Sequence, residues 1–182
     1  KSFKLITANN VCAHVPNLKD FFKGIKNILS KDGCMIFEVS YLYDVIKKLS
    51  FDTIYHEHMS YHSVKPLVSF FHGLNLELID CEKVKAQGGS IRVYISHRNN
   101  FKVKKKKILS LIKNEEKLGL FNTIIYRKYY SRINYQKNKL NKILHQFKKK
   151  NLKIYGFGAP AKLTTFFYMF GMKKQLFEAI VD

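Results

Sequence analysis

The order of the apolar segments constrains the fold of this chain more than any other feature. A short apolar run at 3–8 is followed by apolar residues at helical spacing between Leu18 and Leu29, and then by a second apolar run at 34–39. A strand, a helix and a strand in this order are typical of a βαβ unit, which needs a parallel sheet with helices packed on it. The sequence therefore predicts an α/β fold.

The segment up to residue 99 completes the first predicted domain. We expect two further helices and two further strands, over 41–49, 66–73, 76–81 and 90–97. Pro66 is suited to open a helix, and Gly88-Gly89 predicts a turn before the last strand. The last two strands would pair as a hairpin, so the sheet is predicted to close with an antiparallel pair.

Residues 100–182 are predicted to form a second domain. The pattern is helical from 101 to about 150, and Gly119 is expected to separate two helices. A strand, a helix opened by Pro160 and another strand then indicate the start of a second βαβ unit, at 152–157, 160–171 and 177–181.

Positive charge is concentrated in the predicted helical segment. The chain has a formal net charge of +20, and residues 101–153 hold 17 Lys or Arg against two acids, Glu115 and Glu116. A basic helix of this kind can bind nucleic acid or an anionic lipid surface, or it can be a solvated helical face. No base-reading motif accompanies the charge, so we favour the solvated face and keep nucleic-acid binding as an alternative function.

The cysteines and the hydropathy exclude several kinds of protein. Cys12, Cys34 and Cys81 are far apart in the sequence, and none belongs to a Cys-x-x-Cys pair. We therefore expect neither a zinc site nor a disulfide framework in these residues, which suits a reducing cytoplasm. No run is long and apolar enough to span a bilayer, and no signal-peptide pattern is present, so we expect no membrane partner.

The segment from 51 to 63, FDTIYHEHMSYHS, concentrates titratable side chains. Its central eight residues contain three His, two Tyr and one Glu. His titrates near neutral pH, and Glu and Tyr can orient it. His56 and His58 could both bind a metal ion if they lay two apart on a strand, but no third ligand is evident. Proton transfer is therefore the better interpretation of this run.

A second set of candidates lies at the end of the first predicted strand. Ligands of open α/β sheets bind where the strands reach their carboxyl ends. Ala8, Asn9 and Asn10 lie at that end of the 3–8 strand, and His14 follows them. These residues are candidates for a ligand site, and the alternative is a capped strand end with a His whose hydrogen bonds are made within the protein.

Two glycine-containing stretches are candidates for anion contacts. Residues 88–92, GGSIR, could offer backbone N–H groups and a guanidinium, although a plain β-turn explains the glycines equally well. Residues 155–162, YGFGAPAK, follow a predicted strand and open a helix, so the helix N-terminus and Lys162 would face a phosphate. The stretch is not the GxGxxG dinucleotide pattern, because Ala161 occupies the third glycine position.

Several motifs together resemble one family. The stretches ANNVCAHVPNLKDFFKGIKNIL, FEVSYLYDVI, FDTIYHEHMSY, GGSIRVY and IYGFGAPAK occur in this order over essentially the whole chain. They resemble the sugar-nucleotide C-methyltransferases, S-adenosylmethionine-dependent enzymes that methylate C3 of a dTDP-linked 4-keto-deoxysugar. The resemblance implies the second half of a Rossmann-like class I methyltransferase sheet in residues 1–99. It implies a helical segment and the first part of a C-terminal, nucleotide-sugar-binding α/β domain in residues 100–182.

The resemblance also implies parts that this sequence does not contain. The family has an N-terminal zinc-binding domain and a glycine-rich strand–turn that cradles the adenosyl group, and neither is found in residues 1–182. We therefore expect a fragment of a longer enzyme, with zinc only in the N-terminal part. We also expect the 3–8 strand to form an exposed apolar sheet edge. A nucleotide-sugar-binding remnant without turnover is an alternative function.

The resemblance assigns roles to the candidate residues. His58 matches the family's general base, which removes the C3 proton that the 4-keto group acidifies, and Tyr55 and His14 would stabilise the enolate. Glu57 would hold a sugar substituent or orient the site. The methionine part of S-adenosylmethionine would be contacted by Ala8, Asn9 and Asn10. The nucleotide sugar would be contacted by Gly89, Ser90, Arg92, Gly158, Ala161 and Lys162.

Overall fold

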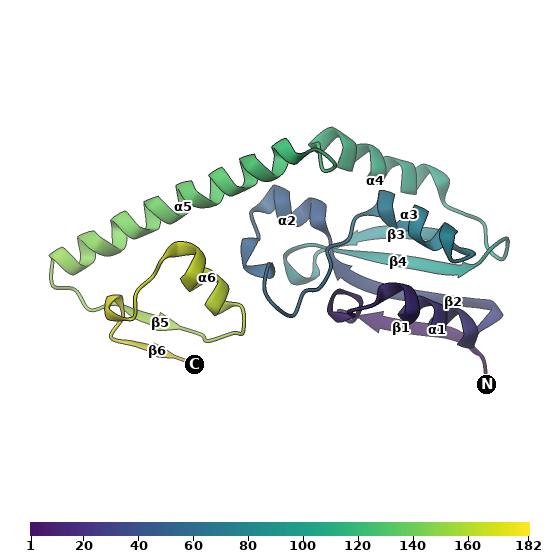
Figure 1. The fold of residues 1–182 in the computed structure, drawn as a ribbon, viewed down its shortest axis with the longest axis horizontal. Coiled ribbons are helices and arrows are strands. Elements are labelled where there is room, and N and C mark those ends of the chain that lie inside the picture. The colour runs from purple at the N-terminus through teal and green to yellow at the C-terminus, as the bar shows by residue number, and fades with distance from the viewer. The chain divides into compact units, whose positions relative to one another are not determined.

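The computed structural model describes all 182 residues, which form two compact units (Figure 1). The first unit contains residues 1–50 and 56–125, and the second contains residues 51–55 and 126–182. None of the helices combines the length and the apolar character that a membrane-crossing segment requires.

The first unit is built on a four-stranded sheet in the order β1-β2-β4-β3. β1 pairs with β2 in parallel, and β4 pairs antiparallel with both β2 and β3. The arrangement confirms the predicted α/β fold and the antiparallel pair that closes the sheet. The strands are β1 (Phe3–Asn9), β2 (Leu29–Ser40), β3 (Leu76–Val84) and β4 (Ser90–His97).

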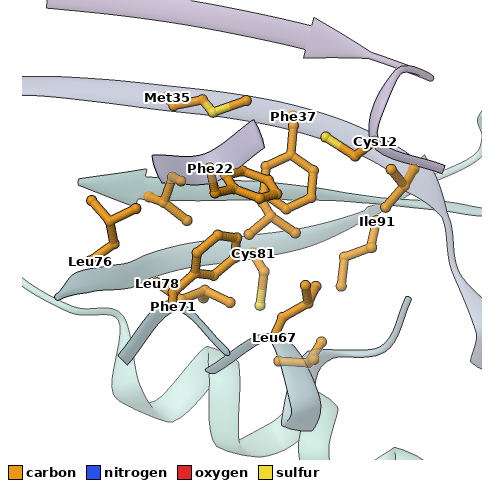
Figure 2. Packing of buried hydrophobic residues seen from close by; sticks show 14 of the residues in the cluster. Cys12, Phe22, Met35, Phe37, Leu67, Phe71, Leu76, Leu78, Cys81 and Ile91 are labelled. Atoms are coloured by element: carbon orange, nitrogen blue, oxygen red, sulfur yellow. The ribbon is translucent and has the colours of Figure 1, made fainter. Parts of the chain in front are cut away.

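Helices α1 and α3 pack on one face of this sheet (Figure 2). Phe22 of α1 contacts Phe37 of β2 and Phe71 of α3, with ring centroids 5.5 and 4.9 Å away. Asn17 begins α1, because its side chain accepts a hydrogen bond from the Asp20 N–H. The helices of this unit are α1 (Leu18–Ile28), α2 (Leu42–Lys48), α3 (Val64–Gly73) and α4 (Lys105–Leu118).

Helix α3 begins two residues before Pro66, at Val64, so the predicted helix start is wrong. The reason is the carboxylate of Glu115 in α4, which is fully buried. It accepts hydrogen bonds from the Val64 and Lys65 N–H groups, at 2.6 and 3.1 Å. A distant carboxylate thus supplies the partners that the first turn of a helix lacks, and Pro66 needs none because it has no N–H.

The segment from Lys31 to Gly33, between the predicted helix and the predicted second strand, is an irregular part of β2. Pairing with β1 jumps from Leu29 to Cys34, so the residues between them have no regular partner. A Cβ atom at Gly33 would lie 2.9 Å from the Phe3 carbonyl oxygen, which leaves room only for glycine. The strand therefore begins at Leu29, five residues before the predicted start at residue 34.

Strand β1 lies at the edge of the sheet. The side chains of Phe3 and Leu5 are 50% and 59% exposed. This confirms the apolar edge that the sequence predicts for residues 3–8, and such an edge favours association with other chains.

Gly119 separates α4 from α5 (Thr123–Lys149), as predicted. Its φ of 77° lies in the left-handed region, and its N–H bonds the carbonyls at the end of α4. Helix α5 begins in the first unit and continues into the second. Three of its side chains are buried in the second unit, those of Tyr129, Ile133 and Leu144.

The second unit contains a short βαβ unit, which confirms the predicted order of elements. β5 (Tyr155–Phe157) and β6 (Ala179–Val181) pair in parallel and are joined by α6 (Leu163–Phe170). Both strands are shorter than predicted. The helix begins three residues after Pro160, because residues 161–162 form a turn that is closed by a hydrogen bond from the Leu163 N–H to the Pro160 carbonyl at 2.8 Å.

Candidate active site

Two predicted site residues, His14 and His58, come together near the carboxyl end of β1. A short 3₁₀ helix at Cys12–His14 follows the strand. The Met59 N–H donates to the Ala13 carbonyl at 2.8 Å and so holds the segment after residue 57 against this helix. The His14 and His58 rings meet edge to face, with centroids 5.1 Å apart. His14 is exposed and His58 is half-buried.

His62 lies four residues after His58, and sequence reasoning gave it no role. Its ring is 6% exposed, and Nε2 lies 3.0 Å from the Ser60 hydroxyl oxygen. The ring also makes a hydrogen bond to the backbone of Cys12. Burial lowers the pKa of His62 to about 4, so the ring is neutral at physiological pH. The signal in the sequence was only its place in the histidine-rich run.

The other residues of that run do not form a strand. His56 and Glu57 are exposed in a turn, and the half-buried Tyr55 belongs to the second unit. The metal-site alternative assumed that His56 and His58 were two apart on a strand, so its premise is wrong. No group of three or more His, Cys, Asp or Glu in residues 1–182 has the geometry of a metal site.

The predicted cofactor residues occupy the carboxyl end of β1. Ala8 is buried, whereas the side chains of Asn9 and Asn10 are exposed. The Asn10 N–H donates to the Glu38 carbonyl of β2 at 2.8 Å, which fixes the path of the chain as it leaves the strand. Two exposed amides at this position are suited to hydrogen-bond an ammonium and a carboxylate. The residues thus fit the amino-acid end of S-adenosylmethionine, and residues 8–10 offer no cradle for its adenosyl end.

Gly89 and Ser90 form a tight connection between β3 and β4. The Gly89 carbonyl accepts the Tyr41 N–H at 3.1 Å, and the Ser90 hydroxyl donates to the Ala86 carbonyl at 3.1 Å. A Cβ atom at Gly89 would lie 2.5 Å from an Asp44 carboxylate oxygen, and the φ angle of Gly89 is 139°. The contacts of both residues are those of a structural turn, the alternative to substrate contact.

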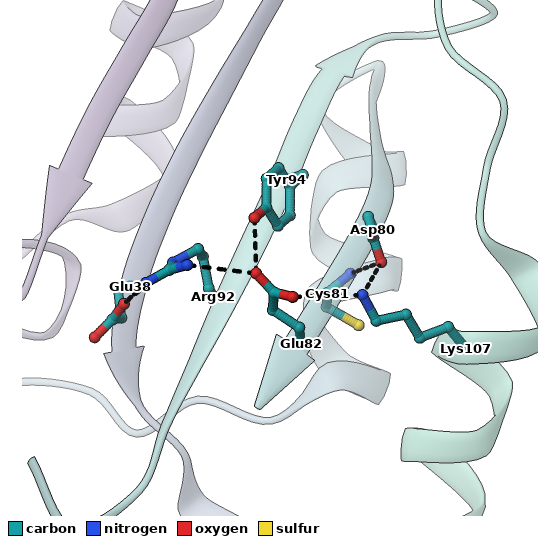
Figure 3. Close-up of polar contacts among 7 residues, drawn as sticks. All are labelled: Glu38, Asp80, Cys81, Glu82, Arg92, Tyr94 and Lys107. Carbon is teal, nitrogen blue, oxygen red and sulfur yellow. Dashed lines mark hydrogen bonds and ion pairs between the residues drawn. The ribbon is translucent and has the colours of Figure 1, made fainter. Parts of the chain in front are cut away.

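Arg92 lies in a row of polar residues across the sheet, on the face opposite the buried Phe37 and Val93 (Figure 3). Its guanidinium contacts Glu38 at 3.0 Å and Glu82 at 3.4 Å. The hydrogen bond to Glu38 raises the pKa of Arg92. Two carboxylates thus already occupy this guanidinium.

Gly158, Ala161 and Lys162 lie on the loop between β5 and α6 of the second unit. The Gly158 N–H donates to the Val181 carbonyl at 2.7 Å. The Lys162 ammonium lies 2.6 Å from a carboxylate oxygen of Asp52, and both side chains are partly exposed. An anion bound here would compete with Asp52 for this ammonium.

The chemistry that this arrangement can perform is acid–base chemistry. A neutral imidazole can accept a proton, and a neighbouring one can donate a hydrogen bond to a developing oxyanion. The thiols offer no alternative nucleophile at this position, because burial raises the pKa of both Cys12 and Cys81 to about 12. His14 and His58 are therefore the candidates for acid–base chemistry at this site.

Comparison with known families matches both parts of the chain. Residues 1–80 match a family described as methyltransferase domain, and residues 85–182 match one described as C-methyltransferase C-terminal domain. The chain is also 26% identical over 159 residues to the C-methyltransferase NovU of Streptomyces niveus. That alignment covers 87% of this chain and 38% of NovU, so the chain spans less than half the length of that relative.

Solved methyltransferase structures are similar over about half of the chain. An S-adenosylmethionine-dependent methyltransferase from Clostridium acetobutylicum is 14% identical, with a TM-score of 0.41 over 53% of this chain and 59% of that one. Magnesium protoporphyrin IX methyltransferase from Synechocystis, with bound SAH, is 10% identical, with a TM-score of 0.40 over 53% of this chain and 45% of that one. These scores describe a partial likeness, so the fold assignment depends on the sheet order and the family matches.

Proposed function

We propose that the protein containing this chain methylates a carbon atom of a small molecule. The chain belongs to the C-methyltransferase family, because it matches the C-terminal domain of that family over residues 85–182. The acceptor that we propose is a nucleotide-linked 4-keto-deoxysugar, methylated at C3. The similarity to NovU supports C-methyl transfer. The histidine-rich run and the GGSIRVY and IYGFGAPAK stretches, which resemble sugar-nucleotide enzymes, support the acceptor.

The contact between His14 and His58 is the observation that carries this proposal. The two residues are 44 positions apart in the sequence, yet their rings are 5.1 Å apart beside the carboxyl end of β1. Ligands of open α/β sheets bind at that end of the strands. Forming a new carbon–carbon bond next to a ketone requires a base to remove a proton, and a hydrogen-bond donor for the oxygen that then becomes negative.

His58 is the base in this proposal. It is half-buried, and the Met59 backbone beside it is hydrogen-bonded to Ala13, so its position next to His14 is fixed by the neighbouring backbone. It takes the proton from C3 of the sugar and leaves an enolate, whose charge lies on the former keto oxygen. His14, which is exposed and adjacent, donates a hydrogen bond to that oxygen.

Ala8, Asn9 and Asn10 would hold the amino-acid end of S-adenosylmethionine. The exposed amides of Asn9 and Asn10 and the backbone at the end of β1 supply the hydrogen-bonding groups for it. When bound, S-adenosylmethionine supplies an electrophilic methyl group. For Tyr55, Glu57, Gly158, Ala161 and Lys162, the proposed contacts with the nucleotide sugar are supported by the resemblance alone.

The test is a methyl-transfer assay on the whole protein. S-adenosylmethionine with a ¹³C-labelled methyl group is mixed with a dTDP-4-keto-deoxysugar, and the product is followed by ¹³C NMR. We expect a new methyl signal coupled to C3 of the sugar. The matched control is the same nucleotide sugar with the keto group reduced to a hydroxyl, which has no acidic C3 proton and should receive no methyl group.

Two outcomes would contradict the proposal. Equal transfer to both sugars would show that the chemistry does not depend on an enolate. Duplex binding that weakens steeply with salt and ignores the nucleotide sugar, without methyl transfer, would favour the nucleic-acid alternative.

A further inference from the structure

A second histidine-centred contact joins the two segments that carry His14 and His58. The His62 ring is buried and makes one hydrogen bond to the Cys12 backbone and one to the Ser60 hydroxyl, at 3.0 Å. Cys12 begins the 3₁₀ helix that carries His14. Ser60 lies two residues after His58. The ring thus connects the two segments that present the paired histidines.

The backbone of His62 is fixed independently of its ring. Residue 62 forms an isolated parallel bridge with Tyr41, and its carbonyl accepts the Leu42 N–H at 2.9 Å. The backbone of His62 is therefore anchored at the carboxyl end of β2 and the start of α2.

We propose that His62 is a positioning residue, which holds the His58 segment against the 3₁₀ helix of His14 through its two ring hydrogen bonds. The inference deepens the proposed function, because it states how the base and its neighbour are kept in contact. A residue with this role must remain neutral, since the ring nitrogen facing the backbone carbonyl has to donate while the nitrogen facing Ser60 accepts.

Packing alone does not account for a histidine at this position. The hollow that His62 lines is also lined by the apolar side chains of Leu18, Phe22 and Phe70, so this part of the unit accepts aromatic rings. A phenyl ring would fill a similar volume and would avoid the cost of burying a polar group. What a phenyl ring cannot supply is the pair of directed hydrogen bonds to Cys12 and Ser60.

The experiment is hydrogen exchange and histidine NMR on the 182-residue chain with His62→Phe. The reporter is the Met59 amide, which bonds the Ala13 carbonyl between the two segments. We expect this amide to exchange about ten-fold faster in the variant, as befits the loss of one or two buried hydrogen bonds. We also expect the ring signals of His14 and His58 to shift, while amides in β2 and β4 keep their protection.

Two further variants separate positioning from a general loss of structure. His62→Asn keeps an N–H donor for the Cys12 carbonyl and should restore part of the Met59 protection. His72→Phe changes an exposed histidine on α3 and should leave both reporters unchanged. Should His62→Phe fail to fold, Ser60→Ala takes its place, with an expected acceleration of about three-fold at Met59.

Unchanged Met59 exchange and unchanged ring signals in a folded variant would overturn the inference. This readout requires no methyl transfer, so the inference and the proposed function fail separately. In the whole protein, His62→Phe should lower kcat and leave KM unchanged, because the substrate contacts themselves remain. A rise in KM alone would also count against positioning.

Discussion

The two units of this chain differ in how much buried apolar packing supports their candidate site residues. In the first unit, His14 and His58 are presented by segments fastened to a buried apolar cluster of eighteen residues. In the second unit, only four apolar side chains are buried, those of Tyr129, Ile133, Leu144 and Phe170. Its glycine-containing loop is held by surface contacts such as that of Lys162 with Asp52.

This difference shows that two equally compact sequence motifs can be held in place to very different degrees in the structure. Both the histidine-rich run and the YGFGAPAK stretch are compact motifs of candidate functional residues. The first is held by the hydrogen bonds of the buried His62 and by the bond from Met59 to Ala13, which favour one geometry, as acid–base chemistry needs. The second is exposed, and an exposed ion pair contributes little to a fixed geometry. We therefore expect a rigid acid–base pair in one unit and an adaptable anion-binding loop in the other.

The largest expected effect comes from Phe22→Ala in the first unit. Phe22 is 1% exposed and contacts Phe37 and Phe71, so its removal leaves a cavity that should cost about 4 kcal/mol of unfolding free energy. Hydrogen exchange resolved by segment should show the loss in the first unit and leave α6 unchanged. The matched change is Phe170→Ala, which should loosen α6 and spare the sheet. Equal loosening of both units by either change would contradict the comparison.

The second expected effect is a pH dependence of the stability of the first unit, caused by His62. His62 has a pKa of about 4 in the folded chain against 6.5 ordinarily, so the unfolded chain binds a proton more readily between these values. Stability should therefore be greatest above pH 6.5 and fall by roughly 3 kcal/mol as the pH decreases to 4. Urea unfolding at several pH values measures this, and His62→Phe should flatten the profile in that range.

The third effect concerns the buried carboxylate of Glu115. It accepts hydrogen bonds from Val64, Lys65 and the Tyr41 hydroxyl, and burial together with Glu115 raises the pKa of Tyr41 so that it stays a donor. Glu115→Gln should cost about 2 kcal/mol, because an amide offers one acceptor oxygen in place of two. Glu116→Gln is the control, since its exposed pair with Lys65 should contribute less than about 0.5 kcal/mol. Similar losses of unfolding free energy in the two variants would refute this distinction between a buried and an exposed carboxylate.

The smallest effect on stability is expected in the second unit, where binding should change instead. Lys162→Ala breaks an exposed ion pair and should alter the unfolding free energy by less than about 0.5 kcal/mol. We expect it to weaken binding of a nucleoside diphosphate by about five-fold, whereas Asp52→Asn should strengthen it by releasing the ammonium. Calorimetry on both variants measures this, and unchanged affinity in each would remove Lys162 from the proposed anion contacts.

Local pattern was enough to predict the architecture from the sequence. The apolar runs of β1 and β2 with the helical spacing between them gave the βαβ unit, and Gly119 marked a helix end because its conformation needs glycine. Helix starts were less predictable. Pro66 and Pro160 are good first residues, yet the true starts depend on hydrogen-bond partners, including a carboxylate 51 residues away from Val64.

The candidate site also has features that could be predicted from the sequence and features that could not. His14 and His58 could be chosen from residue type and from resemblance, and the structure places them side by side. The polar partners of Arg92 on two neighbouring strands could not be read from residues 88–92, since they depend on strand register. The contacts of His62 could not be predicted for a related reason. They depend on its burial and on the Cys12 backbone, which a linear motif does not describe.

The most direct test of the central claim is deuterium incorporation at C3 of the 4-keto sugar by the whole protein in D₂O. Exchange at C3 reports proton removal separately from methyl transfer. We expect His58→Asn to slow this exchange by at least about a hundred-fold, and His56→Asn, which changes an exposed neighbour in the turn, to leave it near the wild-type rate. Exchange at the normal rate in His58→Asn would show that His58 is not the base.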